Sequence, residues 1–199
     1  MNPAEKYFDA EMRGGALVLS LASDDGTNRL TRARVAALTT FVDELTADPP
    51  SRLILTGNAH FFSAGADLNE IAALTAPEAL RFARMGQRLM SAVAEFPAPT
   101  IAAIHGYCMG GGLDLALACD HRIAGPHALF GHRGAALGLI TGWGGTQRLP
   151  RILGKARALQ MFLAAEKVPA AKALAIGLVN AIAPDPVAHA LQIRVPGAT

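Results

Sequence analysis

The chain has 199 residues, of which 51% are hydrophobic and 17% charged, with a formal net charge of +2. This composition excludes a disordered chain and favours one ordinary globular domain with a sizeable core. The 18 basic residues form no cluster against the 16 acidic ones, so the charge pattern does not predict nucleic-acid binding.

The first third of the chain alternates between predicted strands and a predicted helix. Residues 7–11 and 16–21 are expected to form two short strands joined by a glycine turn. Thr31 is placed to cap a helix that ends before the Asp-Pro-Pro sequence at 48–50. An apolar strand is expected at 52–56. Strand, helix and strand in this order predict a right-handed crossover and a parallel sheet.

The middle of the chain continues the alternation. Residues 58–67 are expected to be a loop of small residues, and residues 77–96 a long amphipathic helix. A buried strand is expected at 100–104, and a helix is expected to open at the three glycines 110–112. The inward face of the long helix is predicted to carry Leu80, Met85, Leu89, Val93 and Phe96.

The last third is predicted to be mainly helical. A strand is expected at 121–124, and an alanine-rich helical region follows at 146–176. Three residues are expected to break this region, namely Pro150, Gly154 and Pro169.

One apolar window, residues 98–119, is long enough to imitate a membrane span. The glycines at 110–112 interrupt it and no aromatic or basic anchors flank it, so a buried strand followed by a buried helix is the better interpretation. The first residues show no apolar leader segment, and a cytoplasmic location is therefore expected.

Two loops rich in small residues, 62–67 and 105–112, are each predicted to join a strand to a helix. Glycine lets a ligand approach the main chain, and free N–H groups at a helix N-terminus carry partial positive charge. Two N–H groups that converge form an oxyanion hole, which suits a thioester carbonyl that becomes an enolate. Close packing of helix on strand explains a single glycine triplet equally well. Neither loop has the glycine spacing of a P-loop or a Rossmann dinucleotide site.

Three motifs follow one another along the chain: FSAGADL at 62–68, MGGGLDLA at 109–116 and GWGGTQRL at 142–149. In this order they resemble the successive signatures of the enoyl-CoA hydratase/isomerase (crotonase) superfamily. Asn28-Arg29-Leu30 and the AIGLV segment at 175–179 extend the resemblance over about residues 7 to 190.

The resemblance implies an α/β fold of the ClpP/crotonase type, a superhelical spiral of ββα units. Residues 1–190 are expected to form a single acyl-CoA-binding core, and residues 191–199 an atypical short tail. A helix is expected at 187–191, but Pro196 and Gly197 end it, so the usual C-terminal helices of the family are expected to be missing. Family members are homo-oligomers, which implies a trimer or hexamer.

The resemblance also implies an enzyme of fatty acid metabolism that binds acyl-CoA thioesters and stabilises their enolates during hydration or double-bond isomerisation. No metal or other cofactor is expected, because coenzyme A is part of the substrate, and neither nucleic acid nor a membrane is an expected partner. The two oxyanion donors would be the backbone N–H groups of Ala66 and Gly111. The residues expected to line the substrate and CoA site are Ala64, Gly65, Ala66, Asp67, Leu68, Asn69 and Gly110.

The sequence departs from the family at the residues that move protons. Hydratases of this family use two glutamates as acid and base. The first position is held by Asp114, a shorter carboxylate that is the candidate catalytic residue. The second position, four residues after Phe130, is held by Gly134, which has no side chain to carry a proton. His132 and Arg133 are the auxiliary candidates that could supply a charge nearby.

These side chains also have structural interpretations. Asp114 can be an acid in the first turn of a helix, where the helix dipole favours it. His132 and Arg133 can belong to a solvated loop, and Asp67 can cap a following helix. Trp143, the single tryptophan, is expected to pack in the core or against the acyl pocket.

Three functions therefore stay open. In the first, Asp114 alone shuttles protons in an isomerisation or a slow hydration. In the second, the oxyanion hole drives decarboxylation or C–C cleavage of an acyl-CoA without a second glutamate. In the third, the chain is a non-catalytic or truncated binder of CoA thioesters.

Overall fold

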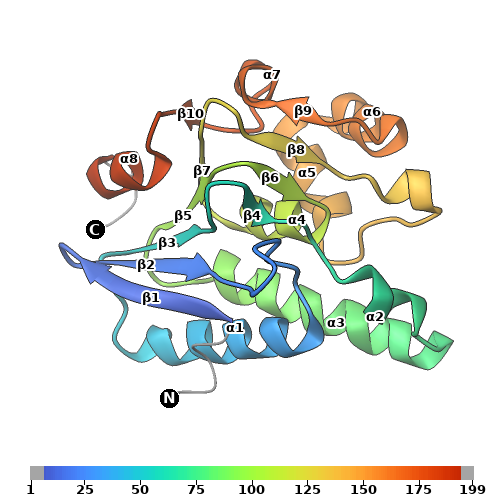
Figure 1. Ribbon diagram of the computed structural model, residues 1–199, viewed down its shortest axis with the longest axis horizontal. Coiled ribbons are helices and arrows are strands. Elements are labelled where there is room, and N and C mark those ends of the chain that lie inside the picture. The colour runs from blue at the N-terminus through green and yellow to red at the C-terminus, as the bar shows by residue number, and fades with distance from the viewer. Residues whose placement is uncertain (1–6, 194–199) are drawn as a thin grey trace.

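The computed structural model describes residues 7–193, and Figure 1 shows two sheets with helices packed around them. The larger sheet has the strand order β1-β2-β3-β5-β7-β10. β1 and β2 pair antiparallel, whereas each later pair in this order is parallel. The predicted hairpin and the predicted parallel crossover are both confirmed. Its strands are β1 (Phe8–Arg13), β2 (Ala16–Leu21), β3 (Arg52–Thr56), β5 (Thr100–Ile104), β7 (His121–Ala124) and β10 (Ala181–Ile182).

The smaller sheet has the order β4-β6-β8-β9. β4, β6 and β8 run parallel, and β9 joins antiparallel. The prediction of an uninterrupted loop at 58–67 is wrong, because β4 forms there, and β6 likewise forms inside the second glycine loop. Strands of three residues are too short to show an alternating pattern, and pairing with neighbours holds them in place. The strands are β4 (Phe61–Ser63), β6 (Tyr107–Met109), β8 (Leu129–Gly131) and β9 (Val168–Pro169).

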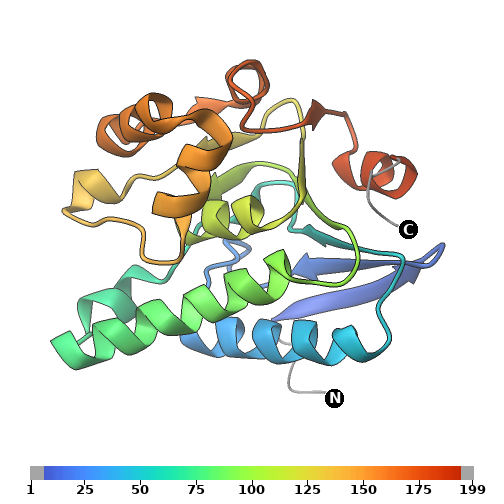
Figure 2. The same ribbon diagram turned by 180° about the vertical axis from the view of Figure 1, so that it is seen from behind.

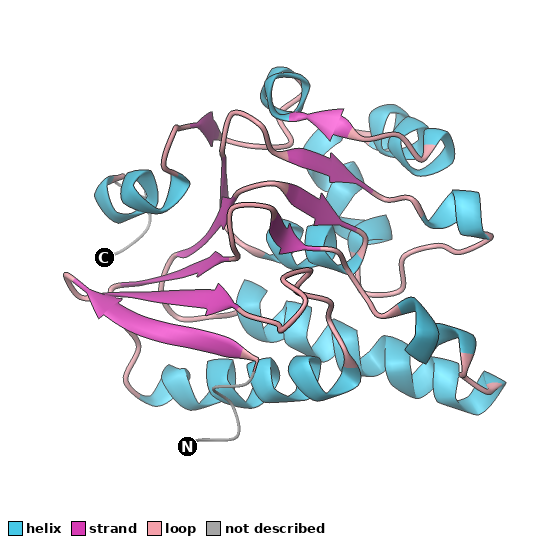
Figure 3. Cartoon of the chain, in the orientation of Figure 1, coloured by secondary structure: helices cyan, strands magenta, loops and turns pink. Residues whose placement is uncertain are grey.

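Helices pack against both sheets, as the colouring in Figure 3 shows. In Figures 1 and 2, α1 and α3 lie side by side across one face of the larger sheet, while α8 lies at the opposite side of the molecule. The α-helices are α1 (Arg32–Glu44), α2 (Leu68–Ala72), α3 (Ala76–Ala94), α4 (Gly111–Ala118), α5 (Gly145–Leu153), α6 (Lys155–Ala164), α7 (Ala170–Ala175) and α8 (Pro186–Gln192), and the 3-10 turns are η2 (Leu45–Ala47) and η3 (Gly134–Leu137).

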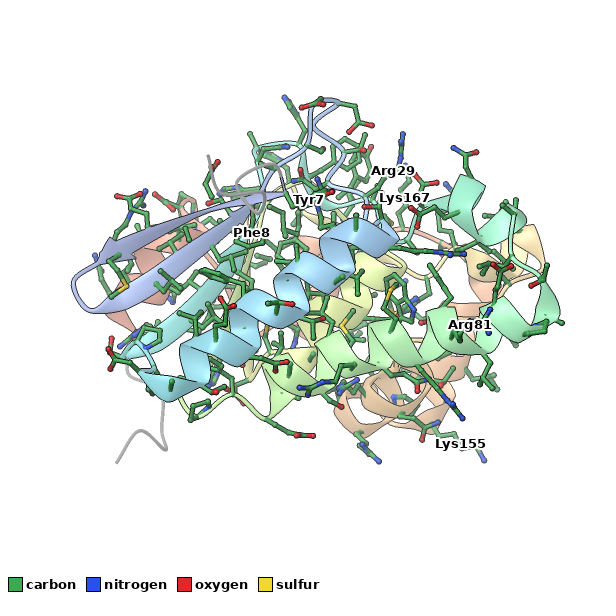
Figure 4. The ribbon with its side chains drawn as sticks, turned by 90° about the horizontal axis from the view of Figure 1, so that it is seen from below. Tyr7, Phe8, Arg29, Arg81, Lys155 and Lys167 are labelled. Carbon is green, nitrogen blue, oxygen red and sulfur yellow. The ribbon has the colours of Figure 1, made fainter. Side chains whose placement is uncertain are left out.

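Side chains alternate between the two faces of the larger sheet. Leu19 of β2 is fully buried in the main core, which it shares with α1 and α3. Its neighbour Val18 points the other way, into a smaller cluster with Ile54 of β3 and Ala190 of α8. On the main-core side, the ring of Phe8 packs at a tilt against that of Phe41 of α1 with ring centroids 4.9 Å apart, and Figure 4 labels Phe8 beside that helix. The strands β2, β3, β5 and β7 are therefore buried on both faces, as their apolar runs require, whereas the edge strand β1 is mostly exposed.

Most predicted helices form where expected. The Thr31 hydroxyl accepts a hydrogen bond from the Arg34 N–H and caps α1, as predicted. The predicted break at Pro150 is wrong, because α5 runs through it. The buried Leu149 and Leu153 anchor that helix on both sides of the proline, and the Pro150 carbonyl still accepts from the Gly154 N–H. The break at Gly154 is confirmed.

The long helix differs from its prediction at one end. Leu89 and Val93 are buried as expected, but Leu80 is 56% exposed. Figure 2 shows why, because the N-terminal end of α3 projects past α1 and has no sheet beneath it. The apolar window 98–119 folds as β5, β6 and α4. Among residues 7–193, no helix is long and apolar enough to cross a membrane.

Candidate active site

Two loops meet at one edge of the smaller sheet. β4 and β6 are parallel neighbours, so the loop after Ser63 and the N-terminus of α4 lie at the same edge. The approach is close, since a Cβ added to Gly65 would lie 2.6 Å from the Met109 carbonyl oxygen and 3.0 Å from the Gly111 nitrogen. Gly65 also has φ of +93°, a conformation that favours glycine. A side chain at residue 65 would therefore push the two loops apart.

The backbone nitrogens of Ala66 and Gly111 lie next to each other where the loops meet. A Cβ added to Gly111 would lie 3.3 Å from the Ala66 nitrogen. Across residues 7–193, neither N–H donates a hydrogen bond to another residue. Gly111 opens α4, so its N–H has no acceptor within the helix. Both residues line the same cavity, and two free N–H groups in one cavity are what an oxyanion hole would require.

A largely apolar cavity of about 440 Å³ adjoins these two N–H groups. Of the residues predicted to line a substrate site, Ala64, Ala66, Leu68 and Gly110 lie in its wall. The remaining three, Gly65, Asp67 and Asn69, do not. Asp67 instead caps α2, as the structural interpretation predicted, and its carboxylate accepts from the Asn69 and Glu70 N–H groups. Further wall residues are Ile71 of α2 and, from segments farther along the chain, Phe82, Leu139, Trp143 and Phe162.

Trp143 closes the cavity beside Gly111. Its side chain is buried, and its indole Nε1 donates to the Phe82 carbonyl oxygen at 3.2 Å. The ring fits between two glycines, because a Cβ at Gly86 would lie 2.2 Å from it and a Cβ at Gly111 would lie 2.6 Å from it. Trp143 thus packs in the core and against the cavity, and α3 and α4 depend on glycine to accept it.

Asp114 lies in the first turn of α4 with its side chain 1% exposed. The Thr141 hydroxyl donates to Asp114 Oδ2, while burial raises the pKa of this carboxyl to about 7. The Thr141 hydrogen bond and the positive charge of Arg148 act in the opposite direction and lower that pKa. A carboxyl group with a pKa near neutrality, in the wall of a cavity, can both accept and return a proton.

His132 follows β8 and is also buried, so its interpretation as part of a solvated loop is wrong. Its Nε2 lies 3.3 Å from Asp114 Oδ1, and burial lowers the pKa of the imidazole to about 4. Arg133 is exposed at the cavity wall, as that interpretation predicted.

Gly134 begins η3, and main chain already fills the space that a side chain there would need. A Cβ added to Gly134 would lie 2.7 Å from the Leu139 carbonyl oxygen. The Leu139 N–H donates to the Gly134 carbonyl oxygen at 2.8 Å, which holds this turn closed. The position therefore has neither a carboxylate nor room for one.

Two features of this site were missed by sequence reasoning. Thr141 holds Asp114, and the only available signal was its place directly before the third motif. Gly145, the first residue of α5, packs against both proton-carrying groups, because a Cβ there would lie 2.2 Å from Asp114 Oδ1 and 3.0 Å from His132 Nε2.

Comparison with known proteins shows which families of proteins the chain is similar to. The family model described as enoyl-CoA hydratase/isomerase matches residues 11–195. A "probable enoyl-CoA hydratase" of Bacillus subtilis strain 168 is 42% identical over 160 residues, which cover 79% of this chain and 62% of that relative. The chain thus matches less than two thirds of the length of this curated relative.

Solved structures are similar over most of the chain. DspI of Pseudomonas aeruginosa superposes with a TM-score of 0.88 and 37% identity, covering 92% of this chain and 71% of that one. An enoyl-CoA hydratase from Bacillus anthracis gives a TM-score of 0.88 and 33% identity, covering 93% of this chain and 74% of that one. The α/β fold predicted from the three motifs is confirmed.

Proposed function

The chain belongs to the enoyl-CoA hydratase/isomerase family, and on that premise we propose that it moves the double bond of an enoyl-CoA thioester. The observation that carries the proposal is a single buried carboxyl, Asp114, in the wall of a cavity that also contains two free N–H groups. One carboxyl is sufficient for this reaction because the same group removes and returns the proton.

The reaction needs no other reactant. With a 3-enoyl-CoA substrate, the ionised Asp114 removes a proton from C2, and the electron pair of that C–H bond moves toward the thioester. The negative charge of the dienolate rests on the thioester oxygen, where the Ala66 and Gly111 N–H groups donate to it. Asp114 then returns the proton to C4, which leaves a double bond between C2 and C3. The apolar cavity suits the acyl chain of such a substrate.

Hydration is the less favoured reaction at this site. It adds water across the double bond and is divided between two carboxylates in the family. Here the second position is Gly134, and main chain takes up the space of its side chain. Decarboxylation and C–C cleavage need the oxyanion donors more than a base, so they stay as alternatives for the test, as does binding without turnover.

The test compares three substrates and one variant. The wild-type chain is incubated with a 3-enoyl-CoA, crotonyl-CoA and a malonyl-type thioester, and the products are separated by chromatography. We expect conversion of the 3-enoyl-CoA to be fastest, and we expect Asp114→Ala to abolish it while CoA affinity changes only a few-fold. Equal turnover by Asp114→Ala would remove Asp114 from the mechanism. Faster hydration or decarboxylation would replace the proposed reaction, and measurable binding with no turnover would indicate a binding protein.

We also propose that the chain is a homo-oligomer, a trimer or hexamer. Support comes from α6, which exposes Leu159 and Leu163 at 53% and 69%. Sedimentation velocity tests this assembly, and a monomer at all concentrations would contradict it.

A further inference from the structure

Two buried atoms beside the cavity lack partners. Among residues 7–193, the buried side-chain nitrogen and oxygen atoms that have no hydrogen-bond partner are Asp114 Oδ1 and His132 Nε2. They lie 3.3 Å apart. Buried polar atoms in folded proteins nearly always have partners, since an unpaired one costs free energy. These two atoms are therefore placed to form a hydrogen bond with each other.

Packing on three sides fixes the imidazole in this position. Phe162 of α6 contacts its ring with centroids 5.1 Å apart. Gly145 of α5 lies so close that a Cβ there would be 2.2 Å from Asp114 Oδ1 and 3.0 Å from His132 Nε2. The backbone of His132 follows β8, which pairs with β6. The ring therefore has little freedom to turn away from Asp114.

When Asp114 is ionised, the neutral form of the ring leaves one arrangement that satisfies both atoms. Desolvation disfavours the imidazolium, and an ionised carboxylate has no hydrogen to donate. A neutral imidazole with its hydrogen on Nε2 can donate to Asp114 Oδ1, while Thr141 already donates to Oδ2. Both oxygens of the carboxylate then accept a hydrogen bond.

We propose that His132 is the positioning residue of Asp114, and that its neutral imidazole donates the Nε2 hydrogen to Oδ1 and holds the carboxylate in its ionised form. A donor to the charged form of an acid favours that form. His132 therefore keeps a deeply buried carboxylate able to act as a base near neutral pH. This role rests on the proposed function, in which Asp114 removes the proton from C2.

Other charges around the pair are few. Arg148 on α5 faces Asp114 with a positive charge, and Cys108 on β6 faces it with a buried thiol. Arg133 follows His132 in the chain and is exposed. The Thr141 hydroxyl is uncharged. A change in the titration of Asp114 on substitution of His132 therefore reports the loss of the contact with His132, and comparing His132→Leu with His132→Gln separates its hydrogen bond from its burial.

The first test does not depend on turnover. Nitrogen and proton NMR of the imidazole rings, recorded against pH, identifies the His132 signal by its absence in His132→Gln, with the exposed His127 as a reference signal. At pH values above about 8, where Asp114 is ionised, we expect His132 to be neutral with its hydrogen on Nε2, and we expect Asp114→Asn to change both its shifts and its titration. A ring with its hydrogen on Nδ1, or one unaffected by Asp114→Asn, would overturn the proposal.

The second test uses the pH profile of the isomerisation. Activity is expected to rise with pH as Asp114 ionises. His132→Leu removes the donor, and a midpoint raised by about one pH unit would lower the rate near pH 7 by about five-fold. The loss of rate in His132→Leu should become smaller at higher pH, whereas a merely structural defect would lower the rate at every pH. His132→Gln should recover part of the rate lost in His132→Leu, because its amide can donate a hydrogen bond. His127→Gln is the matched surface control.

The two failures are distinguishable. If the wild-type chain converts no thioester but the NMR result is as expected, the proposed reaction fails and the pairing stands. If the chain is active and the midpoint of His132→Leu equals that of the wild type, the positioning role is refuted.

Discussion

The buried pair of Asp114 and His132 predicts an unusual dependence of stability on pH. The Asp114 pKa is about 7 in the folded chain against 3.8 for an unperturbed aspartate. Between these values the folded state holds one more proton than the unfolded state, so the free energy of unfolding falls as pH rises. The slope is about 1.4 kcal/mol per pH unit, or about 4 kcal/mol over the whole interval.

His132 acts with the opposite sign. Its pKa falls from 6.5 to about 4 on folding. Between these values the unfolded state holds the extra proton, and the free energy of unfolding rises with pH by the same slope. The two contributions therefore cancel between about pH 4 and 6.5, so in the wild-type chain this pair does not change the free energy of unfolding with pH in that range.

Removing either residue should reveal the other. Relative to wild type, the free energy of unfolding of Asp114→Asn should rise with pH across this interval, and that of His132→Gln should fall. Urea unfolding followed by far-ultraviolet circular dichroism measures both curves, and subtracting the wild-type curve cancels the remaining titratable groups. Curves for the three proteins that run parallel would refute the reasoning, because they would show that neither group changes its pKa on folding.

Two further predictions concern glycines. Gly134→Glu should not create a hydratase, because the new Cβ would lie 2.7 Å from the Leu139 carbonyl oxygen. We expect the free energy of unfolding in urea to fall by about 1–3 kcal/mol and the rate of crotonyl-CoA hydration not to rise. A stable variant that hydrates crotonyl-CoA faster would contradict this. Gly86→Ala should also destabilise by about 1 kcal/mol or more despite the better helix propensity of alanine, because its Cβ would lie 2.2 Å from the Trp143 ring. Gly142→Ala is the control, since its Cβ would lie 3.7 Å from Ala83, an ordinary van der Waals distance. Equal unfolding curves for the two alanine variants would show that the Trp143 ring can move aside at no cost in stability.

The fold could be predicted in the parts where local signals are strong. Thr31 caps the start of α1, the prolines after Asp48 stop the helical segment that η2 continues, and the apolar run at 52–56 forms the buried strand predicted for it. The strands β4 and β6 could not be predicted, because three residues carry no period and their pairing joins segments far apart in the sequence. The proline at 150 does not end α5 as its local preference predicts, because burial of Leu149 and Leu153 outweighs the local cost of a proline.

In the candidate site, too, the features set by local sequence could be predicted and those set by contacts between distant segments could not. The motifs around Gly65 and Gly111 place two backbone donors in the correct loops, since glycine is needed wherever the main chain approaches itself closely. The contact between Asp114 and His132 depends on the pairing of β6 with β8 and on the packing of α5. No pattern within one segment reports such a contact, so His132 could be named only as an auxiliary candidate.

The turn at Gly134 has an evolutionary consequence. A residue lost from a surface can be regained by one codon change, but here the carbonyl oxygen of Leu139 has taken the place of the side chain. A carboxylate at residue 134 requires a different main-chain path for residues 134–139. Neither the substitution alone nor the change of path alone would supply a second group that carries protons. The chemistry of this site is therefore held in its present form by main-chain geometry.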